Sequence, residues 1–339
     1  MRIYGLIVLI ALAACQSPAG APPLRVLPSG AAREPTQPKT ATYLYASAAP
    51  LNNASIERFR LSNGVPAKKP DLVYPGYGGS LAVGGDGTLY AGYGTTSGTG
   101  VIDVFPPGTT RPAREILVPN ISAQCRAGPG GFTGINAVAA DAKGYVLAAI
   151  YTSPFAALRR AWKGHLPWPC EGVAIYPPGA MGYVHPSQVI RYSGAIIDIA
   201  VDAADRLYVA HDRVIVDEFK NAIVAPTRTR TFRSRFVGYV KTIATGARAD
   251  VFIAGTDWEY RNGHIDRFDS HSKGHGPPAS LITLGPGAHL LLSMAEHGRV
   301  LYVDDTDKTV DLYHAYQGGP QSPFYSLPVT KVFSIAVGP

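Results

Sequence analysis

Four aspartates lie within eight positions near the carboxyl end of the chain, in the segment LYVDDTDKTVDLYH (residues 301–314). They are Asp304, Asp305, Asp307 and Asp311. Calcium loops use carboxylates at such spacings, but they also need a glycine for the sharp turn and a bidentate glutamate, and neither follows here. Aspartate and threonine favour turns because their side chains hydrogen-bond to nearby backbone groups. We therefore predict a turn between two strands, with calcium binding as the alternative.

A second cluster of metal-binding residue types occurs in GHIDRFDSHSKGHGPP (residues 263–278). Its members are His264, Asp266, Asp269, His271 and His275. Imidazole and carboxylate groups together bind transition metals. Strand alternation puts His264 and Asp266 on one face, whereas His271 and His275 fall in the Gly/Pro-rich loop beyond. We predict a solvated rim, with a metal site as the alternative. A divalent metal is the only cofactor that either cluster suggests.

Four arginines alternate in TRTRTFRSRF (residues 227–236), namely Arg228, Arg230, Arg233 and Arg235. The formal net charge of the chain is +7. A basic patch of this kind favours anionic surfaces such as lipid headgroups, lipopolysaccharide or acidic glycans. An ordinary solvated outer strand is the alternative.

The longest interruption of the strand pattern is SPFAALRRAWKGHLPWPCEG (residues 153–172). Its apolar and basic residues predict a short amphipathic helix followed by a Pro-Trp-Pro turn. The segment is either part of a binding face or a flap over a sheet edge. As a binding face it would use Phe155, Arg159, Arg160, Trp162, Lys163 and Trp168.

Sequence motifs for catalysis are absent. The chain has no G-x-S-x-G elbow, Walker A sequence, H-E-x-x-H pair or C-x-x-C pair. We therefore predict no catalytic residue.

The elements that would position these residues form an internal repeat. Five segments share a short apolar strand, a polar turn with Gly or Asp, and a second apolar strand. They are LAVGGDGTLYAGY (81–93), VAADAKGYVLAAI (138–150), IAVDAADRLYVAH (199–211), IATGARADVFIAG (243–255) and SMAEHGRVLYVDD (293–305). A third, alternating strand follows each copy, at 101–108, 172–179, 214–221, 264–271 and 309–316. The chain is therefore predicted to be a series of antiparallel meanders.

A sixth copy is split between the two ends of the chain. SIAVGP (334–339) matches SLAVGG (80–85), while TYLYAS (42–47) matches TLYAGY (88–93) and is followed by SIERFRLSNG (55–64). Joined in space, these segments complete one unit and remove the exposed edges of an open array. We predict an all-β, six-bladed propeller that is closed by the C-terminal strand pairing with the N-terminal blade. Because the copies are spaced unevenly, by about 44 to 61 residues, a seven-bladed ring is the alternative.

The pattern resembles the NHL and related six-bladed β-propellers, which include the gluconolactonase-like and TolB-like folds. IAVDAADRLYVAH and VLYVDDTDKTVDLYH carry the resemblance most clearly, and it covers nearly all of residues 41–339. Lactonases of the gluconolactonase-like group hold a central divalent ion with Glu, Asn and Asp. Polar candidates near the inner strands are Asn136, Asp198, Asp202 and Glu296, but they do not match that motif. The resemblance therefore implies an architecture and not an activity.

The first residues, MRIYGLIVLIALAAC, combine Arg2, a short apolar run and small residues before Cys15. The run is too short to span a bilayer. The ending Leu-Ala-Ala-Cys resembles the lipobox of bacterial lipoproteins, which implies a signal peptide at 1–14 and a lipid on Cys15. Gln16, rather than Asp, favours the outer membrane, with the protein facing the periplasm or the cell surface.

A tether follows the predicted lipidation site. Residues 15–40 contain six prolines among small residues, a composition that does not form a core. The globular domain is predicted at 41–339. Cys125 and Cys170 remain as a pair in an exported protein, where disulfides persist. Their bridge would stabilise the fold by about 3 to 4 kcal/mol in the chain-entropy model, and two free thiols are the alternative.

These observations favour a cell-envelope lipoprotein whose propeller binds or scaffolds a protein, peptide or glycan partner without catalysis. The membrane is contacted through the N-terminal lipid, and nucleic acid is not expected outside the cytoplasm. The alternative is a metal-dependent hydrolase or lactonase with its site in the central channel.

Overall fold

The structure is a computed structural model. It describes residues 41–48, 54–95, 99–118, 131–154, 170–192, 194–234, 236–257, 262–274, 276–284, 291–305, 308–329 and 332–339. At 131, 132, 152–154, 170 and 305 it describes the backbone alone. The described residues belong to one compact unit, Ala41–Pro339.

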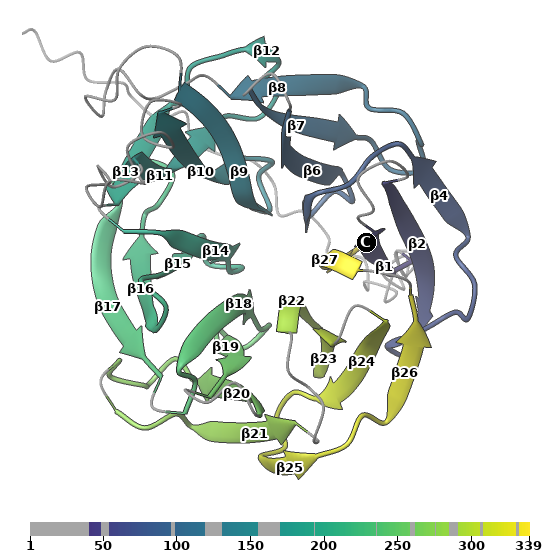
Figure 1. The fold of residues 1–339 in the computed structure, drawn as a ribbon, viewed down its shortest axis with the longest axis vertical. Helices are drawn as coiled ribbons and strands as arrows, with labels where there is room; N and C mark the ends of the chain where they lie inside the picture. The colour runs from purple at the N-terminus through teal and green to yellow at the C-terminus, as the bar shows by residue number, and fades with distance from the viewer. Residues whose placement is uncertain are drawn as a thin grey trace, which may run out of the picture. The chain divides into compact units, whose positions relative to one another are not determined.

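The described chain forms six small, mainly antiparallel sheets around a central axis (Figure 1). Blade 1 contains β27 (Val332–Gly338), β1 (Tyr43–Ala48), β2 (Ser55–Ser62), β3 (Val65–Pro66) and β4 (Leu72–Pro75). Blade 2 contains β5 (Ser80–Val83), β6 (Leu89–Gly94), β7 (Gly100–Phe105) and β8 (Arg114–Val118), and blade 3 contains β9 (Gly131–Ala140), β10 (Val146–Pro154), β11 (Cys170–Tyr176) and β13 (Gln188–Tyr192). The predicted six-bladed propeller is thereby confirmed.

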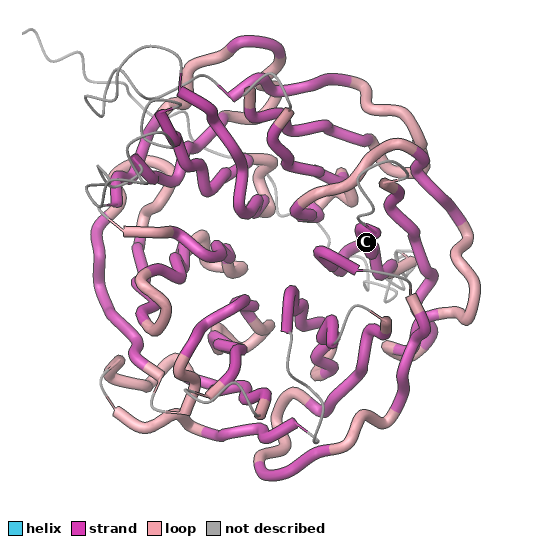
Figure 2. The backbone as a smooth tube through the Cα atoms, viewed as in Figure 1, coloured by secondary structure: helices cyan, strands magenta, loops and turns pink. Residues whose placement is uncertain are grey.

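The other three blades repeat the same order from the axis outward. Blade 4 contains β14 (Ile196–Val201), β15 (Leu207–His211), β16 (Ile215–Lys220) and β17 (Thr227–Arg233). Blade 5 contains β18 (Tyr239–Thr245), β19 (Val251–Thr256), β20 (Gly263–Phe268) and β21 (Ser280–Leu284), and blade 6 contains β22 (Leu291–His297), β23 (Val300–Asp305), β24 (Thr309–His314) and β26 (Tyr325–Pro328). Figure 2 shows only strands and loops in the described parts. In those parts there is no helix long and apolar enough to cross a membrane.

The sequence forms strands because apolar and β-branched residues dominate the two middle strands of each blade. Every residue of β15 and β19 is buried. Such strands are apolar on both faces because a neighbouring blade packs on each side. The six buried apolar clusters accordingly lie between adjacent blades, as where Tyr208 and Phe232 of blade 4 meet Phe268 of blade 5. The core is therefore a ring of six interfaces.

The ring closes between the two ends of the propeller. β1 pairs antiparallel with β2 on one side and with β27 on the other, where Tyr43 lies opposite Gly338. The predicted closure by the C-terminal strand is confirmed. The inner edge of β1 is thereby paired.

Aspartates shape the turns between first and second strands, as the repeat predicted. Asp202 Oδ1 accepts hydrogen bonds from Ala204 N at 2.9 Å and Arg206 N at 3.0 Å. Asp141 Oδ1 accepts bonds from Lys143 N at 2.9 Å and Tyr145 N at 2.7 Å. A carboxylate at this place satisfies backbone donors that would otherwise be unpaired in a tight turn.

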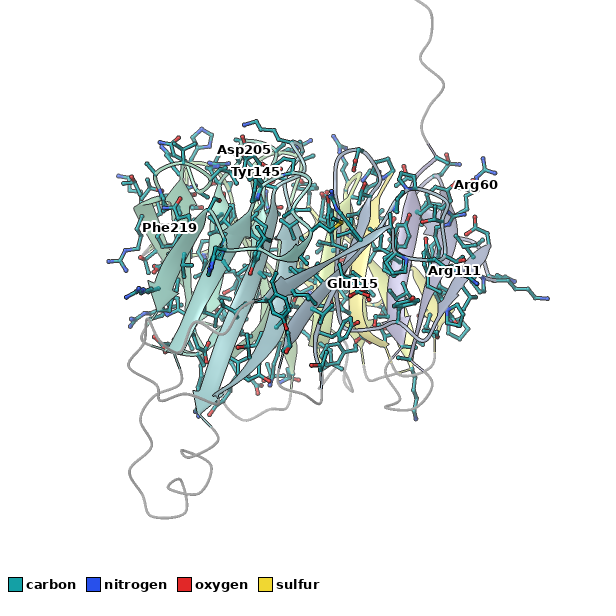
Figure 3. The ribbon with its side chains drawn as sticks, turned by 90° about the horizontal axis from the view of Figure 1, so that it is seen from above. Arg60, Arg111, Glu115, Tyr145, Asp205 and Phe219 are labelled. Atoms are coloured by element: carbon teal, nitrogen blue, oxygen red, sulfur yellow. The ribbon has the colours of Figure 1, made fainter. Side chains whose placement is uncertain are left out.

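Strand directions give the propeller two distinct faces. The innermost strands all begin at one end of the ring, which we call the mouth face, and end at the other, which we call the far face. Figure 3 shows Tyr145, Asp205 and Arg60 near the same edge, which is the far face. The described body also begins there, because Tyr43 pairs with the end of β27.

Candidate functional site

One position of the innermost strands is polar in most blades, and its side chains hydrogen-bond neighbouring blades to one another. Ser334 Oγ accepts a hydrogen bond from Leu81 N, Ser80 Oγ from Val138 N, and Ser293 Oγ from Ile335 N, each at 3.0 Å, and Asp198 Oδ2 accepts one from Ile243 N at 2.9 Å. Each bond crosses from one innermost strand to the next. In β9 this position holds alanine, and the preceding Asn136 instead donates Nδ2–H to Ile196 O at 2.9 Å. These polar groups therefore serve closure of the ring.

One residue per blade precedes this polar position and surrounds the mouth of the channel. These residues are Phe333, Gly79, Asn136, Ile197, Lys241 and Leu292. Phe333 is 49% exposed and Leu292 is 37% exposed, so both large apolar side chains reach the surface. Gly79 has φ +109°, and a Cβ there would lie 2.3 Å from Gly92 O. The mouth thus combines large apolar side chains with polar groups and the ammonium group of Lys241.

A cavity of about 150 Å³ lies at the mouth. Its lining residues are Ser80, Asn136, Ile197, Asp198, Lys241, Leu292, Ser293, Phe333 and Ser334. Burial raises the pKa of Asp198 to about 6, although hydrogen bonds from Ile243 N and Thr242 Oγ1 oppose this shift. Apolar side chains beside an ammonium group suit an apolar ligand group that carries one negative charge.

The channel residues do not fit the divalent ion that the lactonase resemblance implies. The only carboxylate lining the mouth cavity is Asp198, which already accepts hydrogen bonds from three described donors. Lys241 adds a positive charge that repels a cation. In the described ranges no three His, Cys, Asp or Glu side chains come together as a metal site would require. The donor set favours an anionic ligand group.

The aspartates of residues 304–311 are placed differently from the predicted turn. Strand β23 runs on to Asp305, and β24 begins at Thr309, so Asp304 is a fully buried strand residue opposite Val310. Asp311 is also buried, within β24. Only the shorter segment 306–308 connects the strands, and Asp307 lies outside the described residues. The prediction was wrong for Asp304 because aspartate in a strand gives no distinct sequence signal.

The cluster around His264 is spread over two environments. His264 and Asp266 lie in β20, as predicted. The predicted solvated rim was wrong for Asp266, which is fully buried and accepts a hydrogen bond from the hydroxyl of Ser234. Burial lowers the pKa of His264. Asp269 instead caps the following turn through His271 N at 3.0 Å and Ser272 Oγ at 2.9 Å. His275 lies outside the described residues.

A polar cluster around one histidine, His211, lies between blades 3 and 4 and was not predicted from the sequence. His211 Nδ1 is 2.9 Å from Asp212 Oδ2, and its Nε2 is 3.2 Å from Asp217 Oδ2. Burial lowers the pKa of His211, but these two carboxylates outweigh it and raise the pKa overall. Both ring nitrogens are therefore engaged, and the imidazole is an ion-pair partner rather than a free base. The only sequence signal was the His-Asp pair that ends an apolar strand.

A cavity of about 330 Å³ adjoins this histidine. It is lined by Ile190, Arg191, Tyr192, His211, Asp212, Asp217, Phe219 and Arg228. The ring centroids of Tyr192 and His211 are 4.8 Å apart. Arg228 Nη1 lies 3.2 Å from the same Asp217 oxygen that meets the histidine. The cluster joins one imidazole, one guanidinium group and two carboxyl groups.

The arginines predicted as one basic patch are divided by a β-bulge. β17 shifts register against β16 between Glu218 and Phe219, where Arg230 lies opposite Glu218 and Arg228 opposite Phe219. Arg230 consequently pairs with buried Glu218, while Arg228 reaches Asp217 on the other face of the blade. Arg233 is exposed at the end of β17. Arg235 lies outside the described residues.

Several predicted sites fall outside the described residues. They are the lipidation site Cys15 with the tether, Cys125, and the insertion residues Phe155, Arg159, Arg160, Trp162, Lys163 and Trp168. Cys170 begins β11, but its side chain is not described. The lipid, the disulfide and the binding insertion stay predictions.

No family model matches the sequence, and no curated protein is similar enough to count as a relative. Similar solved structures include apo AztD from Citrobacter koseri, at 9% identity and a TM-score of 0.49 over 88% of this chain and 98% of that one. The Malassezia sympodialis allergen Mala s 1 is 10% identical, with a TM-score of 0.49 over 72% and 75% of the two chains. A Lactobacillus plantarum protein is 13% identical, with a TM-score of 0.49 over 86% and 82%. At these identities and scores the similarities carry no functional information.

Proposed function

We propose that this chain is a non-enzymatic binding propeller of the cell envelope, anchored by a lipid on Cys15, that holds a protein partner at its mouth face. The observation that carries the proposal is the mouth ring, in which Phe333 and Leu292 are exposed and Lys241 supplies a positive charge. Exposed apolar groups rimmed by polar ones are typical of protein interaction sites. The partner segment would present an apolar side chain and a carboxylate.

The polar groups beneath the mouth support binding rather than turnover. Ser80, Ser293 and Ser334 accept backbone hydrogen bonds from neighbouring blades, and Asp198 does the same. A catalytic base or nucleophile needs its reactive atom within reach of a substrate. These atoms are committed to the fold.

The experiment is site-specific photo-crosslinking in cells that produce the lipidated protein. A photoreactive phenylalanine analogue replaces Phe333 at the mouth or Val224, which is 84% exposed at the far face, as the control. A discrete adduct is expected from position 333 alone, and Lys241→Glu should remove it while Lys69→Glu, at another exposed lysine, should not.

Two results would overturn the proposal. One is an adduct pattern that is the same at 333 and 224, or no adduct at 333. The other is a purified protein that holds stoichiometric calcium or zinc and hydrolyses lactones, which would establish the hydrolase alternative.

A further inference from the structure

Two blades carry a fifth strand that the next blade supplies. β12 (Gly182–Tyr183) pairs in parallel with β8, the outer strand of blade 2, and β25 (Gly319–Gln321) pairs in parallel with β21, the outer strand of blade 5. Each comes from the connection between the third and fourth strands of the following blade, and lies at the periphery (Figure 1). The molecule thus extends its own outer sheet edges with short parallel strands.

Blade 4 has the same outer edge but no such strand. The corresponding connection of blade 5 touches only the last part of β17, where Arg233 N donates to Gly274 O at 3.4 Å. Arg230 Nη1 donates to the carbonyl oxygens of Ser270 and Ser272, both at 3.0 Å. Within the described parts of the chain, β16 is the only strand that pairs with β17. The first part of β17, Thr227–Thr229, therefore keeps a free edge.

The backbone of the connection is fitted closely to the covered part of β17. Gly274 has φ +76°, and a Cβ at this position would lie 2.4 Å from Thr231 O. Glycine is therefore required where the loop meets the strand. A cavity of about 300 Å³ lies alongside, lined by Arg228, Thr229, Arg230, Thr231 and Lys273.

The groove has a net positive charge because its acidic neighbours are buried and already paired. Glu218 is engaged by Arg230 and Thr229, and Asp217 by His211, Thr231 and Arg228. The cations that remain at the surface are Arg228, with 63% of its side chain exposed, and the exposed Lys220, Arg233 and Lys273. An acidic ligand would meet no exposed carboxylate among the groove-lining residues.

We propose that an extended, acidic peptide segment of a partner protein adds to the free edge of β17 as the fifth strand of blade 4. Main-chain hydrogen bonds to the strand edge would supply affinity, and the cations would select carboxylate side chains. An extended peptide is favoured over an anionic lipid surface because the feature is a strand edge beside a groove. The sheet edges of blades 2 and 5 already use this mode. This site is separate from the mouth, so the result of its test does not depend on the proposed function.

The test is fluorescence anisotropy with the full chain in detergent and three labelled octapeptides. The first alternates Glu with Val, the second alternates Lys with Val, and the third is the Glu peptide with alternate backbone nitrogens methylated. The first should bind, the second should not, and the third should bind about tenfold more weakly because methylation removes strand hydrogen bonds. Lys273→Glu should weaken the first peptide about tenfold.

The matched control is Lys68→Glu, since Lys68 is an exposed lysine in the corresponding connection of blade 1. It should leave affinity unchanged. Equal binding of the methylated and unmethylated acidic peptides would contradict strand addition. An unchanged affinity of the Lys273→Glu variant for the acidic peptide would also contradict it. So would displacement of the peptide by anionic vesicles, if Lys273→Glu and Lys68→Glu weakened vesicle binding equally.

Discussion

Glu171 is a buried side chain whose environment sets its pKa. It is 4% exposed at the start of β11 and accepts a hydrogen bond from Ile196 N of blade 4. Burial raises the pKa of Glu171 to about 7, the Asp212 charge adds to this rise, and the Ile196 bond opposes it. The carboxyl group of Glu171 is therefore about half protonated near pH 7, where an ordinary glutamate is ionised.

We expect Glu171→Gln to be more stabilising at pH 8 than at pH 5. A carboxyl group whose pKa is raised from 4.5 to about 7 in the folded state contributes stability below 4.5, and that contribution is lost as pH rises through 7. Glutamine cannot ionise, so its advantage over glutamate should grow by about 2 kcal/mol between the two pH values. Urea unfolding at both pH values measures this difference.

The matched control is Glu115→Gln, since Glu115 is exposed on an outer strand. Its stability difference from the unchanged protein should vary little with pH. If Glu171→Gln behaved in the same way, Glu171 would not be titrating in a buried environment.

Contacts between single residues could not be predicted from the sequence. The strand positions of Glu171 and His211 follow from the repeat, but Asp217, a partner of His211, comes from the next strand, and Ile196, the partner of Glu171, comes from another blade. Periodicity says which residues face inward. It does not say which inward-facing polar groups meet across an interface.

At the scale of elements, strand alternation was reliable until a bulge interrupted it. Residues two apart in a regular strand share a face, so Arg228 and Arg230 were expected side by side. The register shift in β17 turns them to opposite faces, where each meets a buried carboxylate of β16. No glycine marks this bulge, so it could not be predicted from the residue types. The single basic patch becomes two ion pairs and a few exposed cations.

The inner strands make a prediction about how neighbouring blades are joined. Ser334→Ala removes the acceptor for Leu81 N, a hydrogen bond of 3.0 Å in a buried setting. A buried donor left without a partner costs about 1 to 3 kcal/mol. Ser80→Ala should cost a similar amount, because Val138 N loses its acceptor in the same way. Chemical denaturation of each variant measures the loss.

Ser326→Ala is the control, because Ser326 is an exposed serine in outer strand β26. It should change stability by less than about 0.5 kcal/mol. Inner variants as mild as Ser326→Ala would show that these hydroxyls do not join the blades.

At the scale of the whole molecule, the repeat explains why the architecture was predictable. Six copies of one strand pattern need a closed arrangement to bury both faces of every sheet. The matching ends of the chain indicated how the ring closes, and the pairing of β1 with β27 confirms it. The fifth strands β12 and β25 were not predicted, because two or three residues of extended chain in a loop carry no periodic signal.

Closure makes the final strand essential. Removal of residues 330–339 would expose the inner edge of β1 and strip Val332 and Ile335 from the cluster shared by blades 6 and 1. It would also remove the hydrogen bond from Leu81 N to Ser334 Oγ and the one from Ile335 N to Ser293 Oγ. We expect this truncation to abolish cooperative unfolding in urea and to bind a hydrophobic dye, because an open array exposes apolar faces and a strand edge.

A variant lacking residues 16–40 serves as the control and should unfold cooperatively at the same urea concentration as the full chain. A synthetic peptide of residues 330–339 should restore part of the cooperative transition when added to the truncated protein, because it can re-form the pairs with β1. A truncated protein that unfolds like the full chain without this peptide would show that the ring does not depend on β27. The six interfaces would then have to be stable as an open arc, which the buried faces of β1 and β22 argue against.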